Sequence, residues 1–228
     1  MIAVFINCLA VIVGSVAGLI IGKKLNDDFK TVVFSCSGLI TVVMGIQMGL
    51  ESTNFLALLI AMLLGGFIGY ALKIEDRVLS LGDKLSKVTK SASGGFAMGF
   101  MNASVLFCSG AMAVVGSIQA GTTGDIQTIL IKSVMDGCMA VVFTTVYGIG
   151  VMFSVVSIFI YQGFFTVAGS YLEPVMGEIG ITELSAAGGI LLIMIGSGLT
   201  KVKEFKTANY LPALIFAPVF AKLAARIF

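Results

Sequence analysis

The sequence contains no histidine, and only 11% of its 228 residues are charged. The absence of histidine excludes imidazole general bases, histidine metal ligands and Ser-His-Asp triads. Charged residues make up about 25% of an ordinary soluble domain, so a water-soluble globule is excluded as well. The net charge of +2 is too small to indicate nucleic acid as a partner.

Cysteine is also scarce, with four residues in the chain. All four lie in apolar stretches and none belongs to a Cys-x-x-Cys motif: Cys8, Cys36, Cys108 and Cys138. This pattern indicates small core residues rather than disulfides or metal ligands. We therefore expect no metal and no cofactor.

Apolar residues are in excess, at 58% of the chain. A helix needs about 20 mostly apolar residues to cross a bilayer, and irregular backbone cannot face lipid. We predict an all-α polytopic membrane protein, a single membrane domain over residues 1–228 with about eight transmembrane helices. Their expected ranges are Ile2 to Ile21, Thr31 to Leu50, Asn54 to Leu72, Gly95 to Ala120, two between Gln127 and Leu172, Leu184 to Thr200, and Ala208 to Ala225.

The stretch from Gln127 to Leu172 contains 46 residues, of which only Lys132 and Asp136 are charged. One continuous helix of this length would extend over about 69 Å, more than twice the thickness of the hydrocarbon core. We expect a division at Gly148-Ile149-Gly150. Two full spans and a re-entrant hairpin both fit the pattern.

Basic residues gather in alternate loops. With the N-terminus outside, the cytoplasmic loops hold eleven of the fourteen Lys and Arg residues, and the outer loops hold none. Cytoplasmic loops are enriched in Lys and Arg, so we predict this orientation. Lys222 and Arg226 are exceptions, because eight spans place the C-terminus outside.

The third loop has its own periodicity. Apolar residues recur there at steps of three and four, namely Ile74, Val78, Leu81, Leu85 and Val88. This spacing predicts an amphipathic helix at about 74–90 that lies on the cytoplasmic membrane surface. The alternative is packing against the protein's own cytoplasmic face or against a second subunit.

Two pairs of segments resemble each other. Residues 37–44 are similar to residues 187–194, and residues 54–60 to residues 209–215. Five crossings separate the second and third helices from the seventh and eighth, so the two pairs must have opposite orientations in the membrane. We predict inverted repeats of the kind that many secondary transporters use. Chance similarity between helices rich in Gly and Leu is the alternative.

Small residues recur at four-residue spacing, as at Gly14, Gly18 and Gly22. This spacing lets helices approach each other closely in lipid. The same stripes fit packing within one subunit and the interface of a homo-oligomer.

Lys132 and Asp136 are the ionisable pair inside the predicted spans. Four residues apart, they share one face of the fifth helix and can neutralise each other. Asp136 lies about 15 Å below the outer end of this helix, near the membrane midplane. An ionisable residue at this depth marks an ion or substrate site. A structural ion pair is the alternative.

Further polar side chains on the fourth helix and in the turn after it belong to the same predicted pathway: Asn102, Ser109, Ser117, Gln119 and Asp125. Each of them alone also fits an interhelical hydrogen bond. The last apolar segment contains Pro212 and Pro218, which free backbone carbonyls and bend the helix. We note them as hinge candidates, with a bend for packing as the alternative.

An enzyme is not expected. Gly124-Asp125 resembles the Gly-Asp of membrane aspartyl proteases, but that chemistry needs a second carboxylate beside the first. The other carboxylate at membrane depth is Asp136, which is eleven residues away and close to Lys132.

The central segment carries a longer resemblance. Residues 108–119, followed by Gly121, Gly124-Asp125 and residues 132–137, resemble the central signature of the YdfK/YqgA-like bacterial membrane proteins, which carry domain of unknown function 554. The likeness extends to Ile6-Asn7, Gly14, Gly45-Ile46, Lys203, Ala208-Asn209 and residues 211–213. Ala120 departs from it, because relatives are expected to carry an Asp there. The resemblance implies a bacterial inner-membrane protein, often regarded as a transporter, without an agreed substrate.

These features predict a secondary transporter or channel for a small solute or ion, with a polar site between the fourth and fifth helices. Its partners would be the lipid bilayer and that solute. The alternative is a non-transporting membrane scaffold or sensor with a purely structural ion pair. A polar cavity that reaches Asp136 or Gln119 favours transport, whereas dry packing there favours the scaffold.

Overall fold

The computed structural model describes residues 1–22, 27–78, 80, 95–108 and 111–227. Within these residues every regular element is a helix and none is a strand. The predicted all-α fold is therefore confirmed for the described part of the chain. The elements are α1 (Ile2–Gly22), α2 (Asp27–Leu50), α3 (Phe55–Ala71), α5 (Phe96–Cys108), α6 (Ala111–Thr122), α7 (Gln127–Tyr147), α8 (Gly150–Leu199), the 3-10 helix η1 (Thr207–Tyr210) and α9 (Ala213–Ile227).

Turn chemistry sets several helix boundaries. The side chain of Asn54 caps α3 by accepting a hydrogen bond from the Ala57 N–H at 3.0 Å. Helix α7 ends where Gly148 adopts a φ of 74°, a conformation that glycine tolerates. Helix α8 begins two residues later, at Gly150. The division expected at Gly148-Ile149-Gly150 is confirmed.

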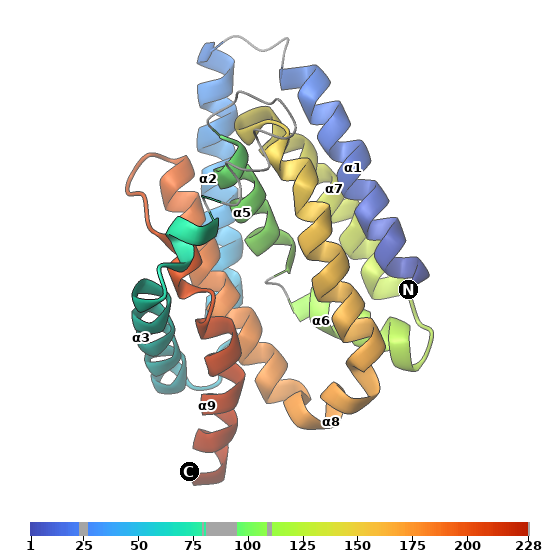
Figure 1. Ribbon diagram of the computed structural model, residues 1–228, viewed down its shortest axis with the longest axis vertical. Helices are drawn as coiled ribbons and strands as arrows, with labels where there is room; N and C mark the ends of the chain where they lie inside the picture. Colours follow the sequence, from blue (N-terminus) through green and yellow to red (C-terminus); the bar gives the residue numbers. More distant parts are fainter. Residues whose placement is uncertain (23–26, 79, 81–94, 109–110, 228) are drawn as a thin grey trace.

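Helix α8 reverses direction within its own bounds. Gly177 interrupts it with a non-helical φ of 59° and ψ of 180°. The stretches on either side, Gly150–Tyr171 and Met176–Leu199, are the first and second arms of α8. In Figure 1 the two arms form a V that points downward.

Within the described ranges, five helical stretches are long and apolar enough to cross a membrane, and the bent pair α5 and α6 adds a sixth if it is one span. The apolar parts of α2 and α3, Ser35–Leu50 and Phe55–Ala71, are shorter. Large side chains on α1 remain 58%, 61% and 60% exposed at Phe5, Leu9 and Val13, as expected for contact with lipid. The chain is thus a membrane protein, and the count of eight spans stays a prediction.

Three expected helices differ from the structure. The fourth, Gly95 to Ala120, consists of α5 and α6, whose axes differ by 61°. The seventh begins at Met176 instead of Leu184, because the charges that indicate a loop in the sequence lie on a helix in the structure. The eighth begins as η1, and the α-helix starts only after Pro212.

The expected surface helix at 74–90 lies largely outside the described residues. Residues 74–78 and 80 are helical. The remainder of that prediction is untested.

Glycines bring α1 and α7 together in parallel. A methyl group at Gly14 would overlap the carbonyl oxygen of Gly137, and one at Gly22 would come within 3.3 Å of Thr145 Cα. The partner number rises with the residue number of α1, so the two helices run in the same direction. Helix α5 is also parallel to the first arm of α8, because Gly150 lies against Phe96 and Ser104 Oγ donates to Ser157 Oγ at 2.9 Å.

Two other contacts are antiparallel. On α2, a methyl group at Gly38 would lie 2.9 Å from the oxygen of Gly196, and one at Gly45 would lie 2.5 Å from that of Gly189. Partner numbers fall along α2, so it runs against the second arm of α8. The segment η1–α9 is antiparallel to α3 in the same way, with Gly65 against Ala213 and Gly69 against Asn209.

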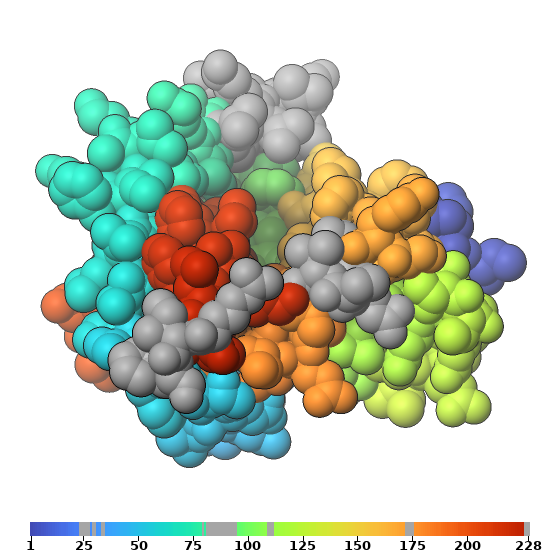
Figure 2. Space-filling model, turned by 90° about the horizontal axis from the view of Figure 1, so that it is seen from below, coloured from blue at the N-terminus to red at the C-terminus, as the bar shows by residue number. Residues whose placement is uncertain are grey.

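The helix ends divide into two groups (Figure 1). The end of α1, the junction of α7 with α8 and the end of α8 lie at the top of the view, and the α2–α3 turn, the bend of α8 and the C-terminus lie at the bottom. The N-terminus lies beside the α6–α7 turn. Figure 2 shows the lower end, with α9 in red near its middle. The main apolar core joins α1, α3, α5, α7, α8 and α9.

Two buried glutamates accept hydrogen bonds from backbone N–H groups at the starts of helices. Glu183, on α8, is 0% exposed and accepts hydrogen bonds at the start of α3, including those from the Thr53 N–H at 2.6 Å and the Asn54 N–H at 3.2 Å. Glu75 accepts from the Ala208 N–H at 2.8 Å and donates its own N–H to Asn209 Oδ1 at 2.9 Å. Each carboxylate satisfies backbone donors that a helix start leaves free.

Candidate functional site

Helix α7 carries a buried ion pair. Lys132 Nζ lies 2.5 Å from Asp136 Oδ2, and the two side chains are 7% and 9% exposed. Asp136 is nine residues after Gln127, which places it about 14 Å along a helix that is about 31 Å long. The structure therefore contains the expected pair at the middle of its span, and its role stays a prediction.

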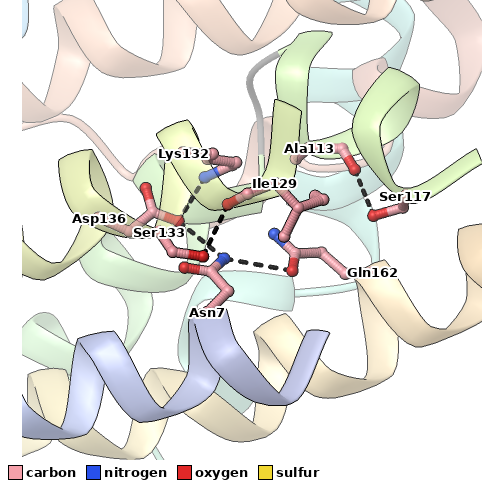
Figure 3. Close-up of polar contacts among 8 residues, drawn as sticks. All are labelled: Asn7, Ala113, Ser117, Ile129, Lys132, Ser133, Asp136 and Gln162. Atoms are coloured by element: carbon pink, nitrogen blue, oxygen red, sulfur yellow. Dashed lines mark hydrogen bonds and ion pairs between the residues drawn. The ribbon is translucent and has the colours of Figure 1, made fainter. Parts of the chain in front are cut away.

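Two amide side chains from other helices complete this cluster (Figure 3). Asn7, on α1, donates through Nδ2 to Asp136 Oδ2 at 3.0 Å and to Gln162 Oε1 at 3.2 Å. Gln162 lies on the first arm of α8, and both amides are 0% exposed. The cluster of Asn7, Lys132, Asp136 and Gln162, called the central cluster below, thus joins three helices.

The central cluster is incompletely hydrogen-bonded. Asn7 Oδ1 and Gln162 Nε2 are buried and have no hydrogen-bond partner among the residues that the structure describes. A buried polar atom without a partner costs about 1–3 kcal/mol. Such an arrangement is typical of a site that a solute or water completes.

The other residues of the predicted pathway are dispersed. Ser117 donates to the Ala113 carbonyl oxygen of its own helix at 2.6 Å. Gln119 Oε1 accepts from Thr128 Oγ1 at 2.9 Å across the α6–α7 hairpin. Asp125 is exposed and accepts from the Gln127 N–H at 2.9 Å, at the start of α7. Ser109 lies outside the described residues.

Asn102 belongs to a separate polar group. Its Nδ2 donates to Tyr147 Oη at 2.9 Å. Both residues line a cavity of about 320 Å³, together with Lys201, Glu204 and Thr207. Lys201 and Glu204 are exposed, so this cavity reaches the surface at the end of the bundle where α8 ends. Lys132 and Asp136 are not among its lining residues.

The hinge candidates occupy different positions. Pro212 precedes α9, and its carbonyl oxygen accepts from the N–H groups of Ile215 and Phe216. Pro218 lies inside α9. The missing N–H of Pro212 therefore costs nothing at a helix start, where it would be unpaired in any case.

Asn7 and Gln162 are the site residues that sequence reasoning missed. The prediction of a site rested on ionisable residues and on the polar side chains nearest to them in sequence. The available signal was a single amide side chain within a long apolar run. Burying an amide in lipid costs free energy unless it has a hydrogen-bond partner.

Comparison with known proteins confirms the family resemblance of the central segment and extends it over nearly the whole chain. The family model described as "Protein of unknown function (DUF554)" matches residues 2–222. The chain belongs to the DUF554 family. Both the central cluster and the cavity at Asn102 lie within the matched DUF554 region.

Two relatives of this DUF554 chain have been compared along nearly their full lengths. "Uncharacterized membrane protein YdfK" of Bacillus subtilis is 28% identical over 217 residues, which cover 93% of this chain and 92% of the relative. "Uncharacterized protein YqgA" of Escherichia coli is 29% identical over 218 residues, covering 93% of each. No solved structure matches the chain.

Proposed function

We propose that this DUF554 protein is a secondary transporter or channel for a small solute or ion, and not an enzyme. The observation that carries the proposal is the central cluster, a buried ion pair beside two buried amides with unpaired polar atoms. Ionisable residues in a membrane are expensive and mark transport pathways by default. The cavity at Asn102 would be the vestibule from one side.

The proposed topology has eight spans in a bacterial inner membrane, with the N-terminus outside. Alternating spans require α1 to be parallel to α7, and α2 to be antiparallel to the second arm of α8, as observed. Exposed basic residues lie in the segments after α3 and after α8: Lys73, Arg77, Lys201, Lys203 and Lys206. By the positive-inside rule this end would face the cytoplasm.

We also propose that α2 and α3 form an inverted repeat with the second arm of α8 and α9. The antiparallel contact of Gly45 with Gly189 supports it, because an axis in the membrane plane relates antiparallel helices. The glutamate contacts are reciprocal in the same sense. Glu183 of the second pair binds the start of α3, and Glu75, just after the first pair, binds the start of η1, which precedes α9.

A double-mutant cycle at the ion pair tests the proposed function. Asp136→Asn and Lys132→Met should each lower the free energy of unfolding by about 3–5 kcal/mol, because each leaves a buried charge unpaired. The double variant should recover much of this loss. Thermal melting in detergent measures the stability terms. Flux into proteoliposomes, with solutes chosen by a thermal-shift screen of metabolites and ions, measures transport.

The result separates transport from the alternative, a membrane scaffold or sensor with a structural pair. A pathway residue predicts that the stable double variant has lost flux. Restored stability with unchanged flux would assign the pair to structure alone. The alternative is supported by one observation, that the cavity at Asn102 does not include the pair in its lining.

A further inference from the structure

The charge of the central cluster restricts what it can bind. Lys132 and Asp136 carry opposite charges 2.5 Å apart, and the other two members are neutral amides. The empty cluster is therefore neutral overall. A net charge at the membrane centre is expensive, so the loaded cluster should be neutral as well. This admits a neutral solute, a cation that replaces a proton of Lys132, or an anion that arrives with a proton.

The unpaired atoms favour the third case. Gln162 Nε2 has two N–H groups, and neither has a partner in the described part of the chain. The ammonium of Lys132 has three N–H groups, and its hydrogen bond goes to Asp136. The available groups are thus mainly donors, which suit a ligand rich in acceptors. A cation would instead need several converging oxygens, whereas the free group of Gln162 is its nitrogen and Asn7 Oδ1 is the one free amide oxygen of the central cluster within the described residues.

The free acceptor on the Asn7 amide fits a proton on Asp136. Asn7 donates through Nδ2 to the Asp136 carboxylate at 3.0 Å, while Oδ1 of the same amide accepts from none of the described residues. A protonated Asp136 has an O–H to donate, and Asn7 Oδ1 is an acceptor on the adjacent amide. Protonation would therefore satisfy Asn7 and release the ammonium of Lys132 for an incoming anion.

We propose that the central cluster binds a small monovalent anion together with one proton, the proton on Asp136 and the anion between Lys132 Nζ and Gln162 Nε2. The proton is taken up as cargo from the hydronium of the surrounding solution, the contact between Lys132 and Asp136 breaks, and Lys132 stays an ammonium. The charge of the cluster with its cargo remains zero. This inference rests on the proposed transport function and names its substrate class.

The surrounding helices offer few other titratable groups. Helix α1 contributes Cys8, α5 contributes Cys108 and the first arm of α8 contributes Tyr161 near the cluster, while α6 has none. Thiols and phenols are ordinarily neutral at pH 7. On α2 the titratable residues are Asp27, Asp28, Lys30 and Cys36, all in its first three turns. Asp136 is therefore the group that the proposal assigns to the proton.

The test uses proteoliposomes that contain the full chain and a trapped pH dye, with the membrane potential clamped by potassium and valinomycin. Inward gradients of chloride, nitrate and methanesulfonate are imposed, since these anions stay ionised and cross lipid poorly. At least one of them should enter with acidification of the lumen, and faster at an external pH of about 5.5 than of about 7.5, because the proton is part of the cargo. Anion entry without acidification would overturn the proposal.

Three variants separate the roles. Gln162→Leu should weaken the apparent anion affinity about tenfold, because it removes a buried donor to a charged ligand, while the fold stays intact. Asp136→Asn should pass the anion without the proton, which gives anion current without acidification. Gln47→Leu, at an exposed glutamine of α2, is the matched control and should behave like the wild type. An unchanged affinity in Gln162→Leu contradicts the anion position even if Asp136→Asn does not fold.

The outcomes also distinguish this inference from the proposed function. If none of the three anions moves, while a cation or a neutral solute moves in a manner that depends on Lys132 and Asp136, transport stands and the anion assignment is wrong. If no class of solute moves, both fail.

Discussion

Glu75 shows how one carboxyl group joins segments far apart in sequence. It follows α3, is 4% exposed and accepts from the Ala208 N–H at 2.8 Å. Burial raises the pKa of Glu75 above its ordinary value, and the hydrogen bond from Ala208 opposes this in part. The folded protein therefore holds the Glu75 proton more tightly than the unfolded chain does.

This shift predicts the pH dependence of stability. The contribution of Glu75 is fully present at low pH, below its unfolded pKa, and is lost as the pH rises through the raised pKa. Glu75→Gln keeps an acceptor for Ala208 without the titration. The melting temperature of the wild type should therefore fall relative to that of Glu75→Gln between about pH 4 and pH 7. Parallel curves for the two proteins would contradict the burial argument, and Glu75→Ala should lower stability at every pH.

At the scale of elements, close helix contacts are made by glycine. The contact of α1 with α7 leaves no room at Gly14 for a methyl group, which would overlap the Gly137 carbonyl oxygen and come within 3.1 Å of Ala140 Cβ. The atom that a methyl group would overlap is a backbone atom of Gly137, so the overlap can be removed only if the two helices separate. This contact holds Asn7 and Asp136 on facing helices, so its spacing bears on the central cluster.

Gly14→Ala should therefore destabilise the fold by about 1–3 kcal/mol through overpacking. Gly198→Ala is the matched control, because nothing lies within 4 Å of a methyl group there. It should be neutral or stabilising by up to about 1 kcal/mol, since alanine favours the helix. Thermal melting of both variants measures the difference, and equal effects would show that close approach of α1 and α7 is not important for stability.

The helices also show which boundaries and contacts can be predicted from the sequence. The division at Gly148-Ile149-Gly150 followed from length alone, because a stretch of 46 residues with two charges exceeds one span. The start of the second arm of α8 did not follow, because the partners of Glu183 at residues 52–54 are about 130 positions away. The Lys132–Asp136 pair could be predicted because its residues are four positions apart on one helix. The hydrogen bond of Asn7 to Gln162 could not, because these residues are 155 positions apart.

At the scale of the whole molecule, contact directions restrict the topology more than hydropathy does. Length and apolarity alone identify five or six spans. Yet the second arm of α8 runs against α2, and α9 runs against α3. If α2 and α3 cross the membrane despite their shorter apolar stretches, every observed direction agrees with alternating spans. A count of eight then brings the two termini to the same side.

This topology predicts opposite labelling at two exposed positions. Lys203 lies after the end of α8, and Glu178 lies at the bend between its arms, so one crossing separates them. In a chain whose four cysteines are replaced, a cysteine beside Lys203 should react with an impermeant maleimide only from the cytoplasmic side, because basic loops stay inside. A cysteine beside Glu178 should react only from outside. Labelling of both from one side would contradict a membrane-crossing second arm. Reversed labelling would keep the eight spans and overturn the orientation, which would place the cavity at Asn102 on the outer face.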